Sequence, residues 1–164
     1  MVLNVAGFED AFRSTLVVDL GAGLVVNTCS LPSLAVLKLI AWHDRRKFSN
    51  KDATDLLFIA QNYAAADNMD RLYEREPELM EAAGYNPELA GAYLLGKDAA
   101  LQSGNGTAAI AKAILENAVL QQELADQIVR TKAASHSIEN EQRYTQYLKG
   151  FSTGFLQQWG APGA

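Results

Sequence analysis

The strongest apolar pattern in the chain covers residues 31–63. Between Leu34 and Ile40, apolar side chains point in nearly every direction around a helical axis, which predicts a helix covered on several sides. Residues 48–50 form a predicted turn, after which Ser49 or Asn50 caps a second helix. We expect this pair of helices to organise the rest of the chain.

Two strands are predicted ahead of the helical pair, at 12–20 and 24–29, because both runs are rich in Val, Leu and Thr. The Gly21-Ala22-Gly23 run between them suits a tight hairpin turn, since glycine adopts positive φ without strain. A lone hairpin is marginally stable in water. We therefore expect cover from the helices downstream, from a second copy of the chain, or from a sheet upstream, in which case the chain is truncated.

Short helices are predicted at 69–76 and 78–83, and a longer one at 86–102, where Asn86 followed by Pro87 is a strong start signal. Ser103-Gly104-Asn105-Gly106 then forms the clearest break in the chain.

Two glycines, Gly91 and Gly96, lie inside the helix predicted at 86–102. Each costs roughly 1 kcal/mol relative to alanine in a helix interior, so close packing against another helix is the expected reason for them. We interpret Tyr85 and Tyr93 as packing residues rather than ligands.

After the break, one long helix capped by Thr107 is predicted to about residue 130, and a linker at 132–137 leads to a last helix. The last helix carries an apolar stripe that we interpret as core rather than as a cofactor site: Tyr144, Leu148, Phe151, Phe155 and Trp159. These two helices pack either on the preceding region or on a second chain, and we favour a homodimer formed through them.

Together these elements predict an α+β fold that is mainly α-helical, with an N-terminal β-hairpin followed by about six helices. We divide the chain into residues 1–102, which hold the hairpin and the first helices, and residues 107–164, a two-helix C-terminal extension.

Composition narrows the classes of partner. The formal net charge is −5, which argues against an extended nucleic-acid surface because such a surface requires a basic face. Cys29 is the single cysteine, so an internal disulfide and a multi-thiolate metal site are excluded. With no signal peptide and no apolar span of about twenty residues, we expect a cytoplasmic protein without membrane contact.

Candidate chemistry is concentrated in the helical pair. Lys38 is the only charged residue between Leu31 and Trp42, and it projects on the same side of its helix as Arg45. Asp52 and Asp55 share one face of the second helix.

A buried ammonium group needs water, a carboxylate or a bound anion. Lys38 therefore forms either a structural ion pair with Asp52 or Asp55, or part of a ligand site, and the two alternatives have similar weight. Asp52 also suits a capping role with Ser49, at the start of the second helix.

Several runs resemble a known family: LKLIAWHDR at 37–45, KDATDL at 51–56, AGAYLLGKD at 90–98 and LNVAGF at 3–8. They look like the C-terminal half of predicted nucleotidyltransferases related to the AbiEii/AbiGii abortive-infection toxins. The resemblance extends from Met1 to about residue 100 and does not reach the last two helices.

The resemblance implies a small mixed-sheet domain followed by helices, with a nucleoside triphosphate and Mg²⁺ bound through a Gly-Ser segment and an Asp-x-Asp pair. It assigns Lys38 to triphosphate contact and Asp52 to a catalytic or nucleotide-positioning role. Arg45, Lys51 and Asp55 are the further residues expected to line a nucleotide site.

The sequence departs from the family in one respect: no Gly-Ser followed by Asp-x-Asp occurs in its 164 residues. Phosphoryl-transfer chemistry needs such a metal clamp, so we predict no metal ligands in this chain. The leading hypothesis is the nucleotide-binding half of a nucleotide-transfer enzyme, inactive as this truncated chain. The alternative is a non-catalytic interaction or oligomerisation module.

Overall fold

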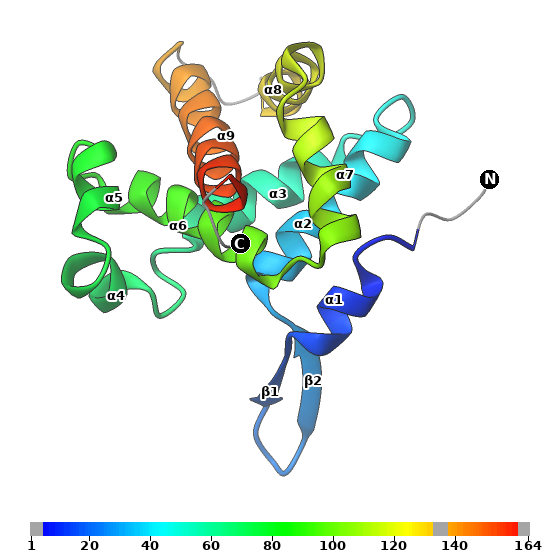
Figure 1. Ribbon diagram of the computed structural model, residues 1–164, viewed down its shortest axis with the longest axis vertical. Coiled ribbons are helices and arrows are strands. Elements are labelled where there is room, and N and C mark those ends of the chain that lie inside the picture. The colour runs from blue at the N-terminus through cyan, green and yellow to red at the C-terminus, as the bar shows by residue number, and fades with distance from the viewer. Residues whose placement is uncertain (1–4, 133–137, 161–164) are drawn as a thin grey trace.

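The computed structural model describes residues 5–132 and 138–160, with side chains placed for 5–131 and 141–160. Within those ranges the fold is α+β and mainly helical, with one two-stranded antiparallel sheet, so the predicted fold class is confirmed (Figure 1). The elements are α1 (Phe8–Arg13), β1 (Thr15–Asp19), β2 (Val25–Cys29), α2 (Leu31–Arg45), α3 (Lys51–Asn62), α4 (Met69–Glu74), α5 (Pro77–Ala82), α6 (Pro87–Gln102), α7 (Asn105–Leu115), α8 (Ala118–Lys132) and α9 (Ile138–Trp159). No helix in this part of the chain has the length and apolarity needed to cross a membrane.

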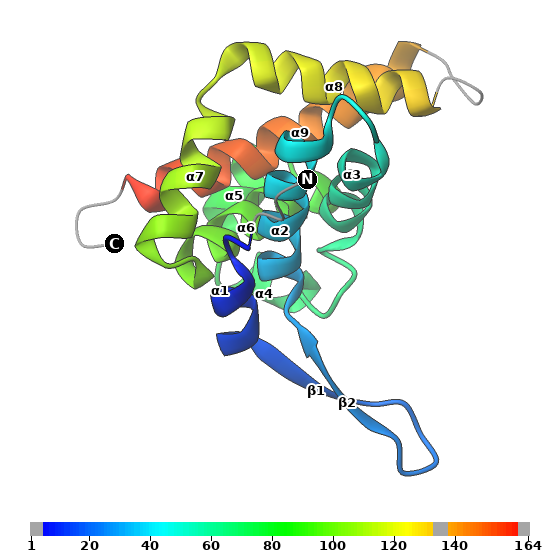
Figure 2. The ribbon, with the colours of Figure 1, turned by 90° about the vertical axis from the view of Figure 1, so that its right-hand side faces the viewer.

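Helix α6 is the centre of the fold, and α2, α3, α4, α5 and α9 all contact it. Its closest neighbour is α9, which lies across it (Figures 1 and 2). A Cβ atom built at Gly96 would lie 2.0 Å from the carbonyl oxygen of Phe151 in α9, and one at Gly91 would lie 2.7 Å from the backbone nitrogen of Ala64. Close packing is therefore the reason for both glycines, as predicted.

The apolar stripe of α9 belongs to the core. Phe151 and Phe155 are buried with ring centroids 6.4 Å apart, and Leu148 is buried beside them. Tyr144 and Trp159 pack against the same cluster while partly exposed. The interpretation of this stripe as core is confirmed, and its apolar face is covered within one chain.

Helices α2 and α3 form where the pattern predicts, although the side chain of Asn50, the N-cap residue of α3, makes no capping hydrogen bond. The Ser30 hydroxyl accepts a hydrogen bond from the Ser33 amide and caps α2, and Pro32 lies in its first turn. Trp42 is fully buried, and its indole nitrogen donates to the Gln127 side chain in α8 at 2.9 Å.

Two predicted boundaries are wrong. Residues 12 and 13 belong to α1 rather than to a strand, because an ion pair between Glu9 and Arg13 supports a helical turn there and Ala11 is buried. The long helix predicted to begin at 107 is two helices, α7 and α8. The Asn117 side chain accepts from the Val119 and Leu120 amides and so caps a new helix.

Two further predictions concern the same region. Helix α7 begins at Asn105, and Thr107 is buried within it rather than at its cap. Most of the linker predicted at 132–137 lies outside the described residues.

The hairpin projects from the helical body, as Figure 2 shows. Val18 pairs with Val26, and the turn has positive φ from Gly21 to Gly23. Three leucines lie on the same face of the hairpin as Val18, because side chains alternate between the two faces of a strand. They are Leu16, Leu20 and Leu24, which are 53%, 61% and 57% exposed. The described helices therefore leave this apolar face uncovered.

Candidate functional site

Helices α2 and α3 bring four of the five predicted site residues into one cluster. The Lys38 Nζ atom lies 2.6 Å from Asp55 Oδ2 and 3.4 Å from Asp52 Oδ1. The Arg45 Nη2 atom lies 2.7 Å from Asp52 Oδ2. These contacts join two cations from α2 to two carboxylates from the first turns of α3.

Burial divides the cluster into an inner and an outer part. The Asp52 side chain is only 5% exposed, and each of its oxygens accepts from a different cation. Asp55 and Arg45 reach solvent, with side chains 35% and 44% exposed. A buried carboxylate requires such partners, so Asp52 anchors the cluster and fixes the positions of both cations.

The charge state of Lys38 follows from its neighbours. Partial burial lowers the pKa of Lys38, but the hydrogen bond and charge of Asp55, followed by those of Asp52, raise it more. The net effect raises the pKa above 10.5, so Lys38 is a cation at neutral pH and can donate to a carboxylate or to a phosphate.

The fifth predicted residue, Lys51, lies exposed in the first turn of α3. Within the part of the chain that the structure describes, its ammonium group has no ion pair. Asn50 is the N-cap residue of α3, so Asp52 is the second residue of the helix. The acid of a capping box is the third, and Asp52 pairs with Lys38 and Arg45 instead.

The family model that matches is the nucleotidyl transferase AbiEii toxin of type IV toxin–antitoxin systems, and it covers residues 6–154. The chain belongs to the AbiEii nucleotidyl transferase family. The match reaches into α9, so the expectation that the resemblance ends near residue 100 is wrong. Comparison with curated proteins and with solved structures gave no match.

Asp52 and Asp55 do not fit the two-carboxylate magnesium site that an AbiEii nucleotidyltransferase is expected to use. Both Asp52 oxygens and Asp55 Oδ2 are already occupied by Lys38 and Arg45, and both cations would repel Mg²⁺. Across residues 5–132 and 138–160, no group of three or more His, Cys, Asp or Glu side chains is arranged to hold a metal ion. We assign no chemical step to a metal at this cluster.

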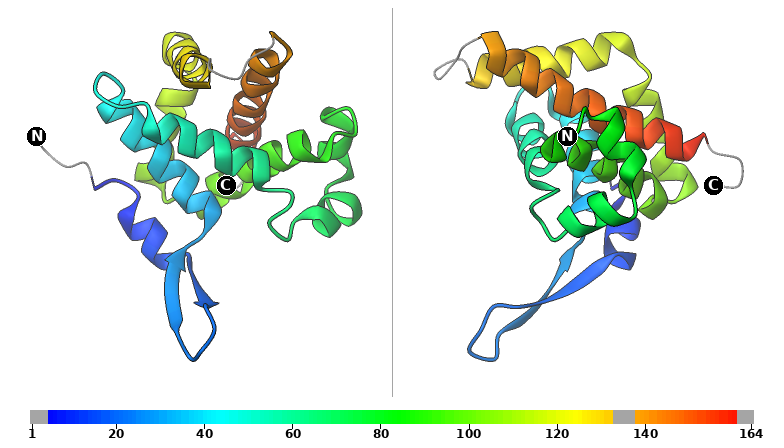
Figure 3. Two further views of the ribbon diagram at one scale, coloured as in Figure 1. Left: turned by 180° about the vertical axis from the view of Figure 1, so that it is seen from behind. Right: turned by 90° about the vertical axis from the view of Figure 1, so that its left-hand side faces the viewer.

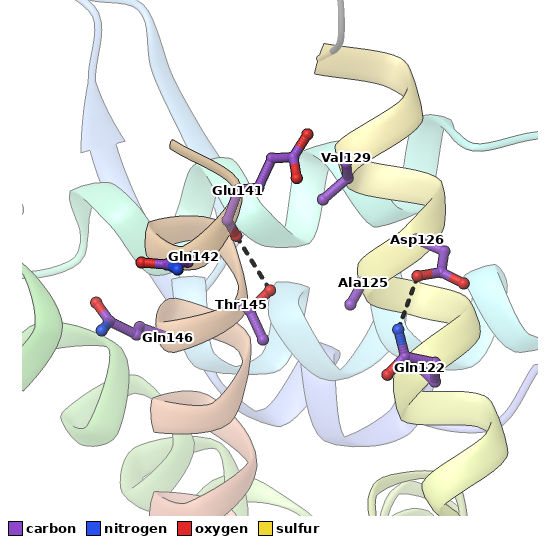
Figure 4. A pocket seen from close by; sticks show the side chains of 8 residues that line it. All are labelled: Gln122, Ala125, Asp126, Val129, Glu141, Gln142, Thr145 and Gln146. Atoms are coloured by element: carbon purple, nitrogen blue, oxygen red, sulfur yellow. Dashed lines mark hydrogen bonds between the residues drawn. The ribbon is translucent and has the colours of Figure 1, made fainter. Parts of the chain in front are cut away.

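A groove of about 500 Å³ between α8 and α9 offers a different surface (Figure 4). Its lining includes the carboxylates of Asp126 and Glu141 and the amides of Gln122, Gln142 and Gln146. Two negative charges disfavour a triphosphate, and none of the predicted site residues lines the groove. This groove therefore does not correspond to the nucleotide site that the family resemblance predicts.

A second ion-pair network includes Lys97 and Asp98, the last two residues of the AGAYLLGKD run that resembles the AbiEii family. Asp98 on α6 is buried, and its two oxygens each accept from Arg71 at 2.7 Å. The Tyr63 hydroxyl also donates to Asp98, at 2.6 Å. Nearby, Lys97 lies 2.6 Å from the buried Glu76.

This network holds α3, α4 and α6 together. Burial raises the pKa of Tyr63, as do the hydrogen bond and charge of Asp98, so the phenol stays protonated and remains a donor. Sequence reasoning missed the partnership of Arg71 with Asp98, since the two residues are 27 positions apart on different helices. The only signal was a charged pair, Lys97 and Asp98, after an uncharged run from Leu89 to Gly96.

Proposed function

We propose that this chain binds a nucleoside triphosphate as part of nucleotidyl transfer, with Lys38 and Arg45 facing the phosphates. One observation carries the proposal. Lys38 and Asp52, the residues that the family resemblance assigns to triphosphate contact and nucleotide positioning, are 14 positions apart in sequence and meet on facing helices. Cytoplasmic location is part of the proposal.

The cluster suggests how a phosphate is accepted. Asp55 is the more exposed of the two carboxylates, so a phosphate oxygen replaces it as the partner of Lys38 more readily than it replaces buried Asp52. Asp52 keeps its bond to Arg45 and holds that guanidinium toward the same surface. Arginine and lysine donors form strong charge-assisted bonds to phosphate. Lys51 is exposed on α3, one turn before Asp55, and adds a further positive charge.

The role we propose for Asp52 is positioning. The Asp52 side chain is buried, and its two oxygens already accept from Lys38 and Arg45, so neither oxygen is placed to contact an acceptor substrate. We further propose that the described residues bind the nucleotide without transferring it. The pairing of Asp52 and Asp55 with cations supports this, as does the lack of a Gly-Ser and Asp-x-Asp segment in the sequence. Mg²⁺ then requires carboxylates other than these two.

Isothermal titration calorimetry with ATP, GTP, CTP and UTP tests the proposal. We expect saturable binding of at least one triphosphate, weakened about tenfold or more by Lys38→Ala, because a charge-assisted hydrogen bond is lost. Lys112→Ala is the matched control, since Lys112 is an exposed lysine on α7 paired only with Glu116. Equal affinity in the Lys38→Ala and Lys112→Ala proteins, or no binding by the unaltered chain, would contradict the proposal.

A second candidate, a non-catalytic interaction module that forms a homodimer, is favoured by the uncovered hairpin. Leu16, Leu20 and Leu24 present an apolar face, whereas the stripe of α9 is already packed inside the chain. In this case the ion pairs at Lys38 only hold α2 and α3 together, so Lys38→Ala lowers the stability of the fold without changing any response to nucleotide. Sedimentation velocity then shows a species of twice the mass of the chain, and Leu20→Lys converts it to the monomer. A monomer throughout would count against this candidate.

A further inference from the structure

A surface cleft of about 400 Å³ lies on α4 and α5. These helices stand at the side of the helical body opposite the turn between α2 and α3 (Figures 1 and 3). The cleft is therefore separate from the cluster at Lys38. It is lined by two tyrosines, two glutamates, a proline and a methionine, which are Tyr73, Tyr85, Glu78, Glu81, Pro77 and Met80.

The two tyrosines of the cleft face solvent. Tyr73 is 59% exposed and Tyr85 is 72% exposed, so the prediction that Tyr85 is a packing residue is wrong. Tyr93, predicted in the same way, does pack against the core. Exposed aromatic rings gathered at a cleft are typical of binding surfaces rather than of solvated ones.

Backbone geometry fixes the position of Tyr85. The Tyr85 amide donates to the Met80 carbonyl at 2.7 Å and the Gly84 amide donates to the Glu81 carbonyl at 2.9 Å, which is the Schellman arrangement at the end of α5. Tyr85 itself has φ +60°, a conformation that a bulky residue rarely adopts. The turn therefore fixes the backbone from which the Tyr85 ring projects, at the cost of backbone strain.

The two glutamates of the cleft form no ion pair among the residues that the structure describes. Glu78 and Glu81 are three positions apart on α5 and both are exposed. By contrast, the neighbouring Glu76 is buried and paired with Lys97. Two uncompensated carboxylates beside two electron-rich rings make the cleft attractive to a cation.

We propose that this cleft binds an arginine side chain presented by a basic segment of a partner protein. The guanidinium lies over the rings of Tyr73 and Tyr85 and donates to Glu78 and Glu81. A planar guanidinium stacks on rings and forks to carboxylates better than an ammonium does, so arginine is preferred to lysine. Phosphate groups are repelled by the same carboxylates.

Titration of the ¹⁵N-labelled full chain with N-acetyl-arginine amide, followed by amide chemical shifts, tests the proposal. We expect saturable shifts at residues 73–85 and little or no shift with N-acetyl-citrulline amide, the neutral analogue of nearly the same shape. Ac-Gly-Gly-Arg-Gly-Gly-amide should bind more tightly than the single residue. Equal binding of the peptide and the single residue would overturn the assignment to a protein partner.

Two variants separate binding from folding. Tyr85→Gly removes the ring and relieves the strain of the positive φ, so Tm should not fall. The affinity for N-acetyl-arginine amide, measured from the shifts, should fall at least fivefold. The double variant Glu78→Gln, Glu81→Gln should show no shifts with N-acetyl-arginine amide. The charge-matched control is the double variant Asp126→Asn, Glu141→Gln, at the groove between α8 and α9. Binding that survives in the Glu78→Gln, Glu81→Gln protein, or equal shifts with citrulline, would overturn the proposal.

Discussion

Replacing Gly154 with alanine is expected to lower the free energy of unfolding by about 3 kcal/mol. A Cβ atom at Gly154 would lie 2.0 Å from the Tyr93 carbonyl oxygen and 3.1 Å from the Lys97 backbone nitrogen, so α6 and α9 must move apart. The obstacle is backbone, which cannot rotate away as a side chain can. For a chain of this size, the loss corresponds to a fall in Tm of about 6–12 °C in thermal unfolding followed by circular dichroism.

Gly96→Ala should have a similar effect, since it meets the Phe151 carbonyl from the other side of the same crossing. Gly106→Ala is the matched control. That glycine lies in α7 with nothing within 4 Å of an added Cβ, and alanine is the better helix former by about 1 kcal/mol. If Gly154→Ala unfolds at the same temperature as Gly106→Ala, the close crossing of α6 and α9 is wrong.

Replacing Asp98 with alanine is expected to cost about 3 kcal/mol, because it removes a buried carboxylate and leaves the partly exposed Arg71 with only its 3.4 Å contact to Glu76. Arg71 makes both of its 2.7 Å bonds to Asp98, and the Tyr63 hydroxyl loses its acceptor in the same variant. Urea-induced unfolding measures the loss as a lower midpoint with an unchanged slope.

Glu116→Ala is the control for this prediction. Glu116 pairs with Lys112 on the exposed face of α7, with its side chain 51% exposed, and such pairs are worth about 0.5 kcal/mol. A loss of similar size in the two variants would show that the network around Asp98 does not stabilise the fold.

Periodicity and start signals were sufficient to predict α2, α3 and α6. A cap at Ser30, Pro32 in the first turn, and Asn86 before Pro87 are local features that depend on few distant residues. The break between α7 and α8 was missed for an equally local reason. The apolar stripe runs on through Ile114, and Asn117 is tolerated inside a helix, so nothing in the pattern shows that it acts as a cap.

The candidate site could be predicted in part. An isolated lysine in an apolar helix requires a partner, and the nearest acids at helical spacing, Asp52 and Asp55, are the ones it contacts. Partners on distant helices could not be predicted from the sequence. Arg46, for example, donates to Glu123 in α8 at 3.1 Å, and the two residues are 77 positions apart. The exposure of Tyr85 was also hidden, because Gly84 signals the end of α5 without showing that the next residue keeps positive φ.

Binding of a nucleoside triphosphate at Lys38 and Arg45 is tested most directly by chemical-shift mapping with a non-hydrolysable ATP analogue on the ¹⁵N-labelled chain. We expect the largest saturable shifts in residues 38–55, and their loss in Lys38→Ala while Lys112→Ala keeps them. Shifts centred elsewhere, such as the groove beside Asp126 and Glu141, or shifts that persist without Lys38, would contradict the assignment and leave the cluster as a structural ion-pair network.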